Sequence, residues 1–349
     1  MRGPATPTER GNPATGVAGS HRPGGTRVAA VSGSQGFIGR HLVRRLGRAG
    51  WSVRALDLAG PDQPADDGVV HHRVDIRDRE AMEAVLDGVE VFFHLASAHL
   101  EHGAPSDWYH SVNVEGAGFV AQASARMGVR RLVHTSSVGI YGDVGKKPVD
   151  EEAPKHPSNL YERTKLMGEE AVLEGAAGQG LEVIILRPGW VYGPGCRRTE
   201  KLLRSVRRRR FAYVGDGSNL RHPLHISDML DAFLLAADAP ASAVGRAYLV
   251  VGPRPVTVRE LVATCARVQK VGEPSLRLPR FLVSAGLHTL ETAFSVLGRT
   301  PPVSRRSLAF FENDNAFSGR AAAEALDFHP RTELEEGLRA TLQAQGGAG

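Results

Sequence analysis

The chain of 349 residues is long enough for one large α/β domain and a smaller lobe. Its 42% hydrophobic and 23% charged residues are typical of a globular protein, which excludes a fibrous or wholly disordered chain. Two cysteines, Cys196 and Cys265, exclude a disulfide framework and suit the cytoplasm, while the net charge of +5 permits an anionic ligand.

Residues 1–26 are rich in Gly, Pro, Thr and Ala and show no apolar periodicity, which predicts a disordered tail. This tail has no apolar core of the kind found in a signal peptide. No stretch of the chain is apolar for long enough to predict a transmembrane segment.

From residue 27 onward, short apolar runs alternate with segments of helical periodicity. This alternation predicts a Rossmann-type α/β fold, a doubly wound parallel sheet of about seven strands with helices on both faces. We expect the sheet domain to span 27–192 with a returning segment near 223–252, and a smaller substrate lobe over 193–345. The expected strands are 28–31, 51–58, 69–74, 89–95, 132–134, 183–186 and 247–251, and the expected helices are 37–49, 79–86, 108–127 and 161–173.

Three glycines stand between the first strand and the first helix, at Gly33, Gly36 and Gly39. Glycines there allow a tight turn and let backbone N–H groups approach a pyrophosphate, which the positive end of the helix also favours. The strand before and the helix after make the pattern more specific than glycines alone. We therefore expect a dinucleotide cofactor to be bound by Gly33, Gln35, Gly36, Phe37, Ile38 and Gly39.

An acidic residue, Asp57, ends the second expected strand. Its carboxylate could accept both hydroxyls of an adenosine ribose, and its charge would repel a 2′-phosphate. The alternative is that Asp57 merely caps a turn. We predict that it binds the ribose and that the cofactor is NAD, with NADP the less favoured.

Tyr161 and Lys165 are four residues apart on an expected helix, so both lie on one face. A tyrosine has a pKa of about 10, and a nearby ammonium group lowers it toward neutrality, where the hydroxyl can exchange a proton with an alcohol. Ser137 follows an apolar strand at the sheet edge where ligands bind. Hydroxyls in this position can also cap a turn. We assign the capping role to Ser136 and a catalytic role to Ser137.

These pieces, in this order over residues 27–340, resemble an extended short-chain dehydrogenase/reductase. The group in question comprises NAD-dependent epimerases, dehydratases and 3β-hydroxysteroid dehydrogenases. The matching residues are Gly33, Gly36, Gly39, Asp57, Asp75, Ile76, His94, Leu95, Ala96, Asn113, Ser137, Tyr141, Tyr161, Lys165, Arg187 and Pro188, together with the stretch 191–195.

By this resemblance, Asp75 and Ile76 flank the adenine of the cofactor. Leu95 and Ala96 line the cofactor channel, and Pro188 lies near the carboxamide of the nicotinamide. The family also implies that the catalytic lysine holds the nicotinamide ribose.

Two positions limit what the resemblance implies. Asn113 is expected among the cofactor-binding residues, although it could instead satisfy backbone groups between helices. Ser137 is followed by Val138 and Gly139, whereas family members that eliminate water carry an Asp-Glu pair there. Elimination needs that extra acid and base, so the sequence disfavours a dehydratase.

Two kinds of substrate remain open. Arg221 stands in a stretch similar to the one whose arginine grips a diphosphate, and the basic run 197–210 precedes it. That run could equally be a solvated face. This interpretation predicts a nucleotide-sugar 4-epimerase or reductase.

The other substrate is an apolar hydroxy or keto compound. The amphipathic stretch 278–297 and the motifs at 301–303, 315–318 and 326–330 resemble the C-terminal lobe of 3β-hydroxysteroid dehydrogenase-like members. The stretch could also be only a packing helix. We favour this interpretation, which predicts an oxidoreductase that interconverts a secondary alcohol and a ketone.

Other classes fit the sequence less well. A non-catalytic NAD(P)-sensing protein would not need the pair of Tyr161 and Lys165. No metal-ligand spacing is present, and the arginine run lacks the interleaved aromatic residues of nucleic-acid binding. We expect a small-molecule substrate and a homodimer formed through the helices that hold Asn113 and Tyr161, with Val120, Ala171 and Val172 on their outer face.

Overall fold

The computed structural model describes residues 26–61, 67–99, 105–296 and 309–346, so nearly all of the expected N-terminal tail lies outside it. Its centre is a seven-stranded sheet in which every strand pairing is parallel. The strands are β1 (Val28–Ser32), β2 (Ser52–Asp57), β3 (Val69–Arg73), β4 (Val91–His94), β5 (Arg131–Thr135), β6 (Glu182–Pro188) and β11 (Arg246–Val250).

The strand order is β11-β6-β5-β4-β1-β2-β3. The chain runs outward from β1 to β3 and then crosses to the other side of β1 to form β4. Such a reversal opens a crevice at the carboxyl ends of the two strands between which it occurs. The predicted Rossmann-type fold class is confirmed, and the crevice beside β1 and β4 is where the site should be sought.

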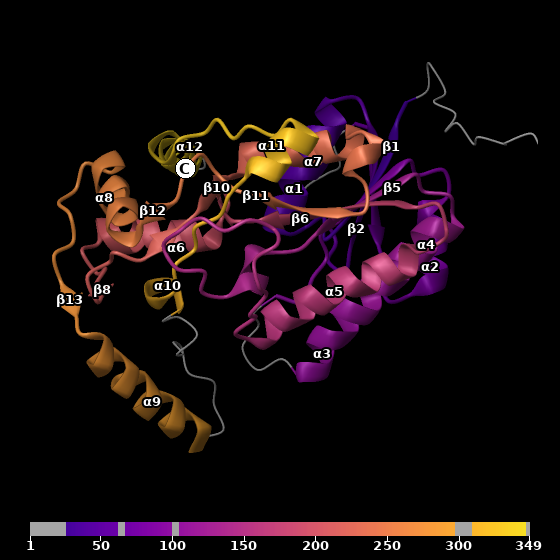
Figure 1. Ribbon diagram of the computed structural model, residues 1–349. Helices are drawn as coiled ribbons and strands as arrows, with labels where there is room; N and C mark the ends of the chain where they lie inside the picture. The colour runs from indigo at the N-terminus through magenta and orange to yellow at the C-terminus, as the bar shows by residue number, and fades with distance from the viewer. Residues whose placement is uncertain (1–25, 62–66, 100–104, 297–308, 347–349) are drawn as a thin grey trace, which may run out of the picture.

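Helices cover both faces of the sheet, as Figure 1 shows. Side chains alternate along β1, so Ala29 and Val31 join one core and Ala30 joins the other. The first core is closed by α1 (Phe37–Arg48), α7 (Ile226–Asp238) and α11 (Arg320–Leu326), and the second by α2 (Arg79–Leu86), α4 (Gly116–Arg126) and α5 (Leu160–Ala176).

The single helix expected over 108–127 is divided into three parts. A short α3 (Ser106–His110) leads into the π-helical turn η1 (Ser111–Glu115), which continues as α4. A π-turn inserts an extra residue into a helix and is frequent at functional sites. Here the turn carries the buried Asn113, whose hydrogen bonds are described below.

A third, smaller core, the core of the second lobe, lies beyond the carboxyl ends of the strands. Leu203, Leu261 and Leu338 pack there, from three helices that are far apart in the sequence. The elements are β7 (Trp190–Tyr192), α6 (Arg197–Arg207), β8 (Tyr213–Val214), β9 (Leu220–Arg221), β10 (Pro223–His225), β12 (Val256–Thr257), α8 (Val258–Val268), β13 (Arg277–Leu278), α10 (Ala309–Glu312) and α12 (Leu334–Gly346). Two short 3₁₀ turns, η2 (Val138–Tyr141) and η3 (Ala241–Ala243), complete the main domain.

One helix, α9 (Arg280–Val296), covers most of the amphipathic stretch predicted over 278–297 and extends away from the body (Figure 1). Its apolar Phe281 and Leu282 are 71% and 55% exposed. The motif at 301–303 lies outside the described residues. Within the part of the chain that the structure describes, no helix is both long and apolar enough to cross a bilayer.

A buried ion pair ties α5 to β6. Arg187 donates to both carboxylate oxygens of Glu169, at 2.9 and 2.6 Å, and also to the hydroxyl of Tyr141 at 2.6 Å. Both charged side chains are almost wholly buried. Loss of either partner would leave the other as an unpaired buried charge, which costs free energy. The pair therefore fixes the helix that carries Tyr161 against the sheet.

Removing one partner of this pair should leave an uncompensated buried charge. We expect Glu169→Ala to lower the free energy of unfolding by about 3–5 kcal/mol. Glu170→Ala, one residue along the same helix but exposed, is the control and should change it by less than about 0.5 kcal/mol. Denaturant unfolding measures both, and equal effects would contradict the assigned role of the pair.

Candidate active site

The glycine turn between β1 and α1 closes by contacts between backbone atoms. Gly36 donates to the carbonyl of Gly33 at 3.0 Å, and Gly33 has a left-handed φ of +69°. A Cβ built on Gly39 would stand 2.1 Å from the same carbonyl oxygen. Only glycine therefore fits this turn, as the sequence predicts.

The turn is suited to an anion. Helix α1 begins after Gly36 without a side-chain cap and without an acidic residue in its first turn. Its first N–H groups are thus left for a ligand, and the helix dipole favours negative charge there. The buried hydroxyl of Ser34 has no partner among the described residues. These residues fit the pyrophosphate of a dinucleotide.

The other residues expected to bind the cofactor around the turn lie where the sequence predicts. Gln35 donates its backbone N–H to Asp57 Oδ2 at 2.9 Å, while Phe37 and Ile38 form the first turn of α1. Asp57 ends β2, and its Oδ1 accepts from the backbone of Ala59 at 3.0 Å. Each carboxylate oxygen has a second lone pair, so Asp57 can still accept the hydroxyls of a ribose.

Leu95 and Ala96 are also brought beside the turn. Their backbone N–H groups donate to the hydroxyl of Ser32, at 3.2 and 3.3 Å. A Cβ on Gly33 would lie 2.8 Å from the nitrogen of Ala96, so the end of β4 touches the turn itself. At the topological switch, the end of β4 and the glycine turn are therefore in contact through backbone atoms.

Three further residues expected at the cofactor lie at or after the carboxyl ends of β3 and β6. Asp75 follows β3, and the Arg77 guanidinium, which donates to it at 2.6 Å, holds the pKa of its carboxyl below the usual value. Ile76 is buried and packs against Gly116 of α4. Pro188 ends β6, next to the strand that leads to Ser137. Their contacts with the cofactor stay predictions.

Asn113 has no hydrogen-bonding capacity left for a cofactor. Its Oδ1 accepts from the backbone of Ala98 at 2.7 Å and from Ser97 at 3.0 Å. Its Nδ2 donates to Ala98 O at 3.1 Å and to Thr164 at 3.0 Å. An amide makes four such bonds at most. Asn113 therefore positions the segment after β4 against α5, in place of the cofactor contact that we expected.

Of the two serines after β5, Ser137 and not Ser136 caps the following turn. Ser137 caps η2 by accepting the N–H of Gly139 at 3.0 Å. Ser136 is the buried one, and its hydroxyl has no partner among the described residues. Ser137 keeps its own hydroxyl hydrogen, because a capping oxygen only accepts. It can thus cap the turn and still donate to a substrate oxygen.

Tyr161 and Lys165 stand in the first turns of α5, which starts cleanly because Asn159 accepts from Glu162 at 3.0 Å. Lys165 reaches the carboxyl end of β5, where its Nζ donates to the carbonyl of Thr135 at 2.6 Å, and Tyr161 lies against His99, which follows β4. Lys165 is 3% exposed. The geometry thus brings the expected acid–base pair and Ser137 to one edge of the sheet.

Burial, more than charge, governs both pKa values. Burial raises the pKa of Tyr161 to about 12, and only Arg198 acts to lower it. Burial also lowers the pKa of Lys165 to about 8. The expected lowering of the tyrosine pKa by Lys165 is wrong for this structure, because the ammonium group is drawn to the carbonyl of Thr135.

Two residues that sequence reasoning missed adjoin Tyr161. The ring of His99 meets the ring of Tyr161 edge to face, with centroids 4.8 Å apart. Arg198, in the first turn of α6, is hydrogen-bonded to His99 Nε2. In the sequence, Arg198 stands just after the Gly-Pro-Gly stretch 193–195, which could have indicated a role at the site. It also belongs to the basic run 197–210, and nothing in that run distinguishes it from the other arginines.

Arg221 is placed in the second lobe and is 7% exposed. Its guanidinium donates to the carbonyl of Phe310 at 3.0 Å, is hydrogen-bonded to Asn315, and stacks on the ring of Phe310 at 4.9 Å. Burial lowers its pKa to about 10. Several of its donors are thus used within the protein.

The family follows from a comparison with known proteins. Residues 29–252 match the model of the NAD-dependent epimerase/dehydratase family. The chain belongs to this family. Membership confirms the resemblance to extended short-chain dehydrogenases/reductases, the enzymatic class, and NAD as the cofactor.

Individual relatives differ in what they act on. The chain is 29% identical to 3β-hydroxysteroid-dehydrogenase/decarboxylase isoform 2 of Arabidopsis thaliana, covering 91% of this chain but only 62% of that protein. It is also 29% identical to 2-alkyl-3-oxoalkanoate reductase of Stenotrophomonas maltophilia, covering 88% and 96% of the two chains. The solved structure of MoeE5 with UDP-glucuronic acid and NAD matches with a TM-score of 0.71 and 27% identity, over 92% and 99%.

The role of Asp57 can be tested by cofactor titration. We expect the protein to bind NAD more tightly than NADP. Asp57→Ala should reduce this difference in affinity, because it should weaken the binding of NAD about tenfold or more. Asp57→Asn keeps an acceptor for the backbone of Gln35 while removing the charge, so it separates repulsion of a 2′-phosphate from loss of the turn. Asp67→Ala, at an exposed position before β3, is the control. Equal affinity of the unmodified protein for NAD and NADP would disprove this role.

Proposed function

We propose that the protein is an NAD-dependent oxidoreductase that interconverts a secondary alcohol and a ketone. The observation that supports this proposal is the position of Lys165, which bonds to Thr135 at the end of β5, two residues before Ser137 and one helical turn after Tyr161. The names of two relatives, a hydroxysteroid dehydrogenase/decarboxylase and a 3-oxoalkanoate reductase, describe the same kind of reaction.

Each of the three residues has a separate part in this reaction. The nicotinamide, when bound, accepts or supplies the hydride. Ser137 donates a hydrogen bond to the substrate oxygen, since its own acceptor side is used by Gly139. Tyr161, whose raised pKa keeps it protonated, donates its proton to the ketone oxygen in reduction, and in oxidation the phenolate takes a proton from the alcohol. Lys165 is held on the carbonyl of Thr135, and the family resemblance implies that it also binds the ribose of the nicotinamide.

The second candidate function is a nucleotide-sugar 4-epimerase or reductase. It is favoured by the likeness to MoeE5, which was solved with UDP-glucuronic acid. Against it, the expected diphosphate ligand, Arg221, is buried and already bound to Phe310 and Asn315. A guanidinium whose donors are already used within the protein binds a diphosphate weakly. We therefore prefer an alcohol or ketone that carries no nucleotide.

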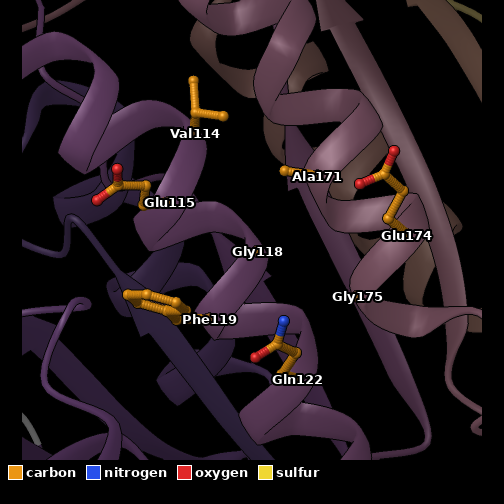
Figure 2. Close-up of a pocket in the computed structure, with 8 residues that line it drawn as sticks. All are labelled: Val114, Glu115, Gly118, Phe119, Gln122, Ala171, Glu174 and Gly175. Carbon is orange, nitrogen blue, oxygen red and sulfur yellow. The ribbon is translucent and has the colours of Figure 1, made fainter.

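A homodimer is the proposed assembly, formed along α4 and α5. A shallow groove runs between these helices, lined by Val114, Gly118 and Phe119 on one side and Ala171 and Gly175 on the other (Figure 2). The apolar edge that we expected needs correction. Val120 and Val172 are buried in the core, and only Ala171 reaches this groove.

The two buried, unpaired cysteines are consistent with a cytoplasmic location.

The acid–base assignment predicts a separation of turnover from cofactor binding. Tyr161→Phe keeps the ring and removes the proton donor, so turnover should fall at least about 100-fold while NAD affinity hardly changes. Lys165→Ala should weaken both. NADH absorbance follows turnover on a panel of hydroxysteroid-like alcohols and nucleotide sugars. Net dehydrogenation accumulates NADH, whereas epimerisation does not.

Tyr213→Phe serves as the control for this experiment, because Tyr213 is buried in the core of the second lobe rather than at the sheet edge. It should retain full turnover. If Tyr161→Phe turned over the responding substrate at the unmodified rate, the acid–base assignment would be wrong.

The dimer predicts that a charge placed in the groove separates the subunits. We expect Val114→Asp to convert a dimer into a monomer in light scattering, because burying an unpaired carboxylate at an interface is costly. Val70→Asp places the same charge on the exposed strand β3, and it should stay dimeric. A monomeric unmodified protein at the same concentration would contradict the assembly.

A further inference from the structure

A histidine and an arginine stand over the catalytic tyrosine, from segments that are far apart in the sequence. His99 follows β4 and presents its ring edge to face against Tyr161, with centroids 4.8 Å apart and planes at 81°. Arg198 reaches the outer side of the same imidazole from the first turn of α6. The guanidinium is therefore one aromatic ring away from the residue assigned to exchange the proton.

Arg198 has no counter-ion in the described part of the chain. Its one side-chain hydrogen bond among these residues is to His99 Nε2, and no carboxylate of the described residues lies within ion-pair distance. The imidazole is a neutral acceptor, because burial and the charges of Arg198 and Lys165 lower the pKa of His99 to about 4. One acceptor uses one of the five guanidinium donors, so the planar fork that fits a carboxylate remains available.

The surroundings of Arg198 differ from those of two other arginines, Arg187 and Arg221. Arg187 is neutralised by Glu169, and Arg221 is buried among acceptors in the second lobe. Arg198 is exposed beside the reacting centre. The phosphates of the cofactor are expected at the glycine turn between β1 and α1, whereas Arg198 lies next to His99 and Tyr161. An anion that binds Arg198 beside Tyr161 would thus belong to the substrate.

We propose that Arg198, oriented by His99, binds a carboxylate that the substrate carries within a few bonds of its reacting carbinol or ketone carbon, as in a 3-hydroxy or 3-oxo carboxylate. This inference rests on the proposed function, because it takes Tyr161 as the group that meets the substrate oxygen. A planar guanidinium binds the two oxygens of a carboxylate in parallel, which fixes the orientation of the substrate as well as its affinity. His99 is a positioning residue in this arrangement.

Binding to the full-length protein loaded with NADH provides the test. NADH with a hydroxy acid forms a complex that cannot turn over, so affinity is measured without chemistry. NADH fluorescence first reports cofactor binding. Calorimetry then compares 3-hydroxyoctanoate with its uncharged methyl ester and with inorganic phosphate. We expect the acid to bind at least about tenfold more tightly than the ester.

Variants assign that preference to a residue. Arg198→Ala should remove the preference for the acid and leave ester affinity unchanged, whereas Arg197→Ala, the exposed neighbour on the same helix, should keep it. His99→Phe should weaken the acid alone, and His99→Gln, which restores an acceptor for the guanidinium, should recover most of the loss.

The outcomes separate this inference from the proposed function. If NADH binds but acid and ester bind equally, or neither binds, the carboxylate site is wrong and the cofactor site stands. Phosphate that binds as tightly as the acid, with the same dependence on Arg198, would also overturn it, in favour of a general anion site. Failure of NADH itself to bind would overturn the proposed function and this inference with it.

Discussion

The contact between Gly39 and the carbonyl of Gly33 is the constraint on which the site depends. A Cβ there would lie 2.1 Å from that oxygen, so α1 can start this close to β1 only without a side chain. The close start also allows Gln35 to bond Asp57, and it lets the end of β4 approach Gly33. One tight turn thus sets the positions of three strand ends, and these ends form the crevice.

The sequence was sufficient for features that depend on neighbouring residues. Strand runs, the glycine turn and the spacing of Tyr161 and Lys165 are local patterns, and their positions agree with the structure. What it could not predict depends on contacts between distant segments. Asn113 looked like a cofactor ligand because nothing local shows that Ala98 and Thr164 occupy its amide. His99 and Arg198 are 99 residues apart, so no spacing rule joins them.

The same limit applies to charge. A tyrosine and a lysine one helical turn apart suggest an interaction between them, and we expected the ammonium to lower the tyrosine pKa. Desolvation is decided by the whole fold, and here it shifts both groups toward their neutral forms. Lys165 bonds to Thr135 because a buried ammonium needs an acceptor, and that carbonyl is within reach. A helical spacing therefore identifies the pair but not its electrostatics.

The hydrogen bonds of Arg221 and Arg198 indicate which of the two kinds of substrate the site favours. Arg221 resembles a diphosphate ligand by its place in the sequence, yet its guanidinium is buried and faces protein acceptors. Moving it to a phosphate would break those bonds and leave buried carbonyls unpaired, which costs free energy before any is gained. Arg198 faces no such cost, since it is exposed and gives up at most one bond to a neutral imidazole. Of these two arginines, the one free to change partners is therefore the one beside Tyr161, which favours a substrate whose charge lies near the reacting carbon.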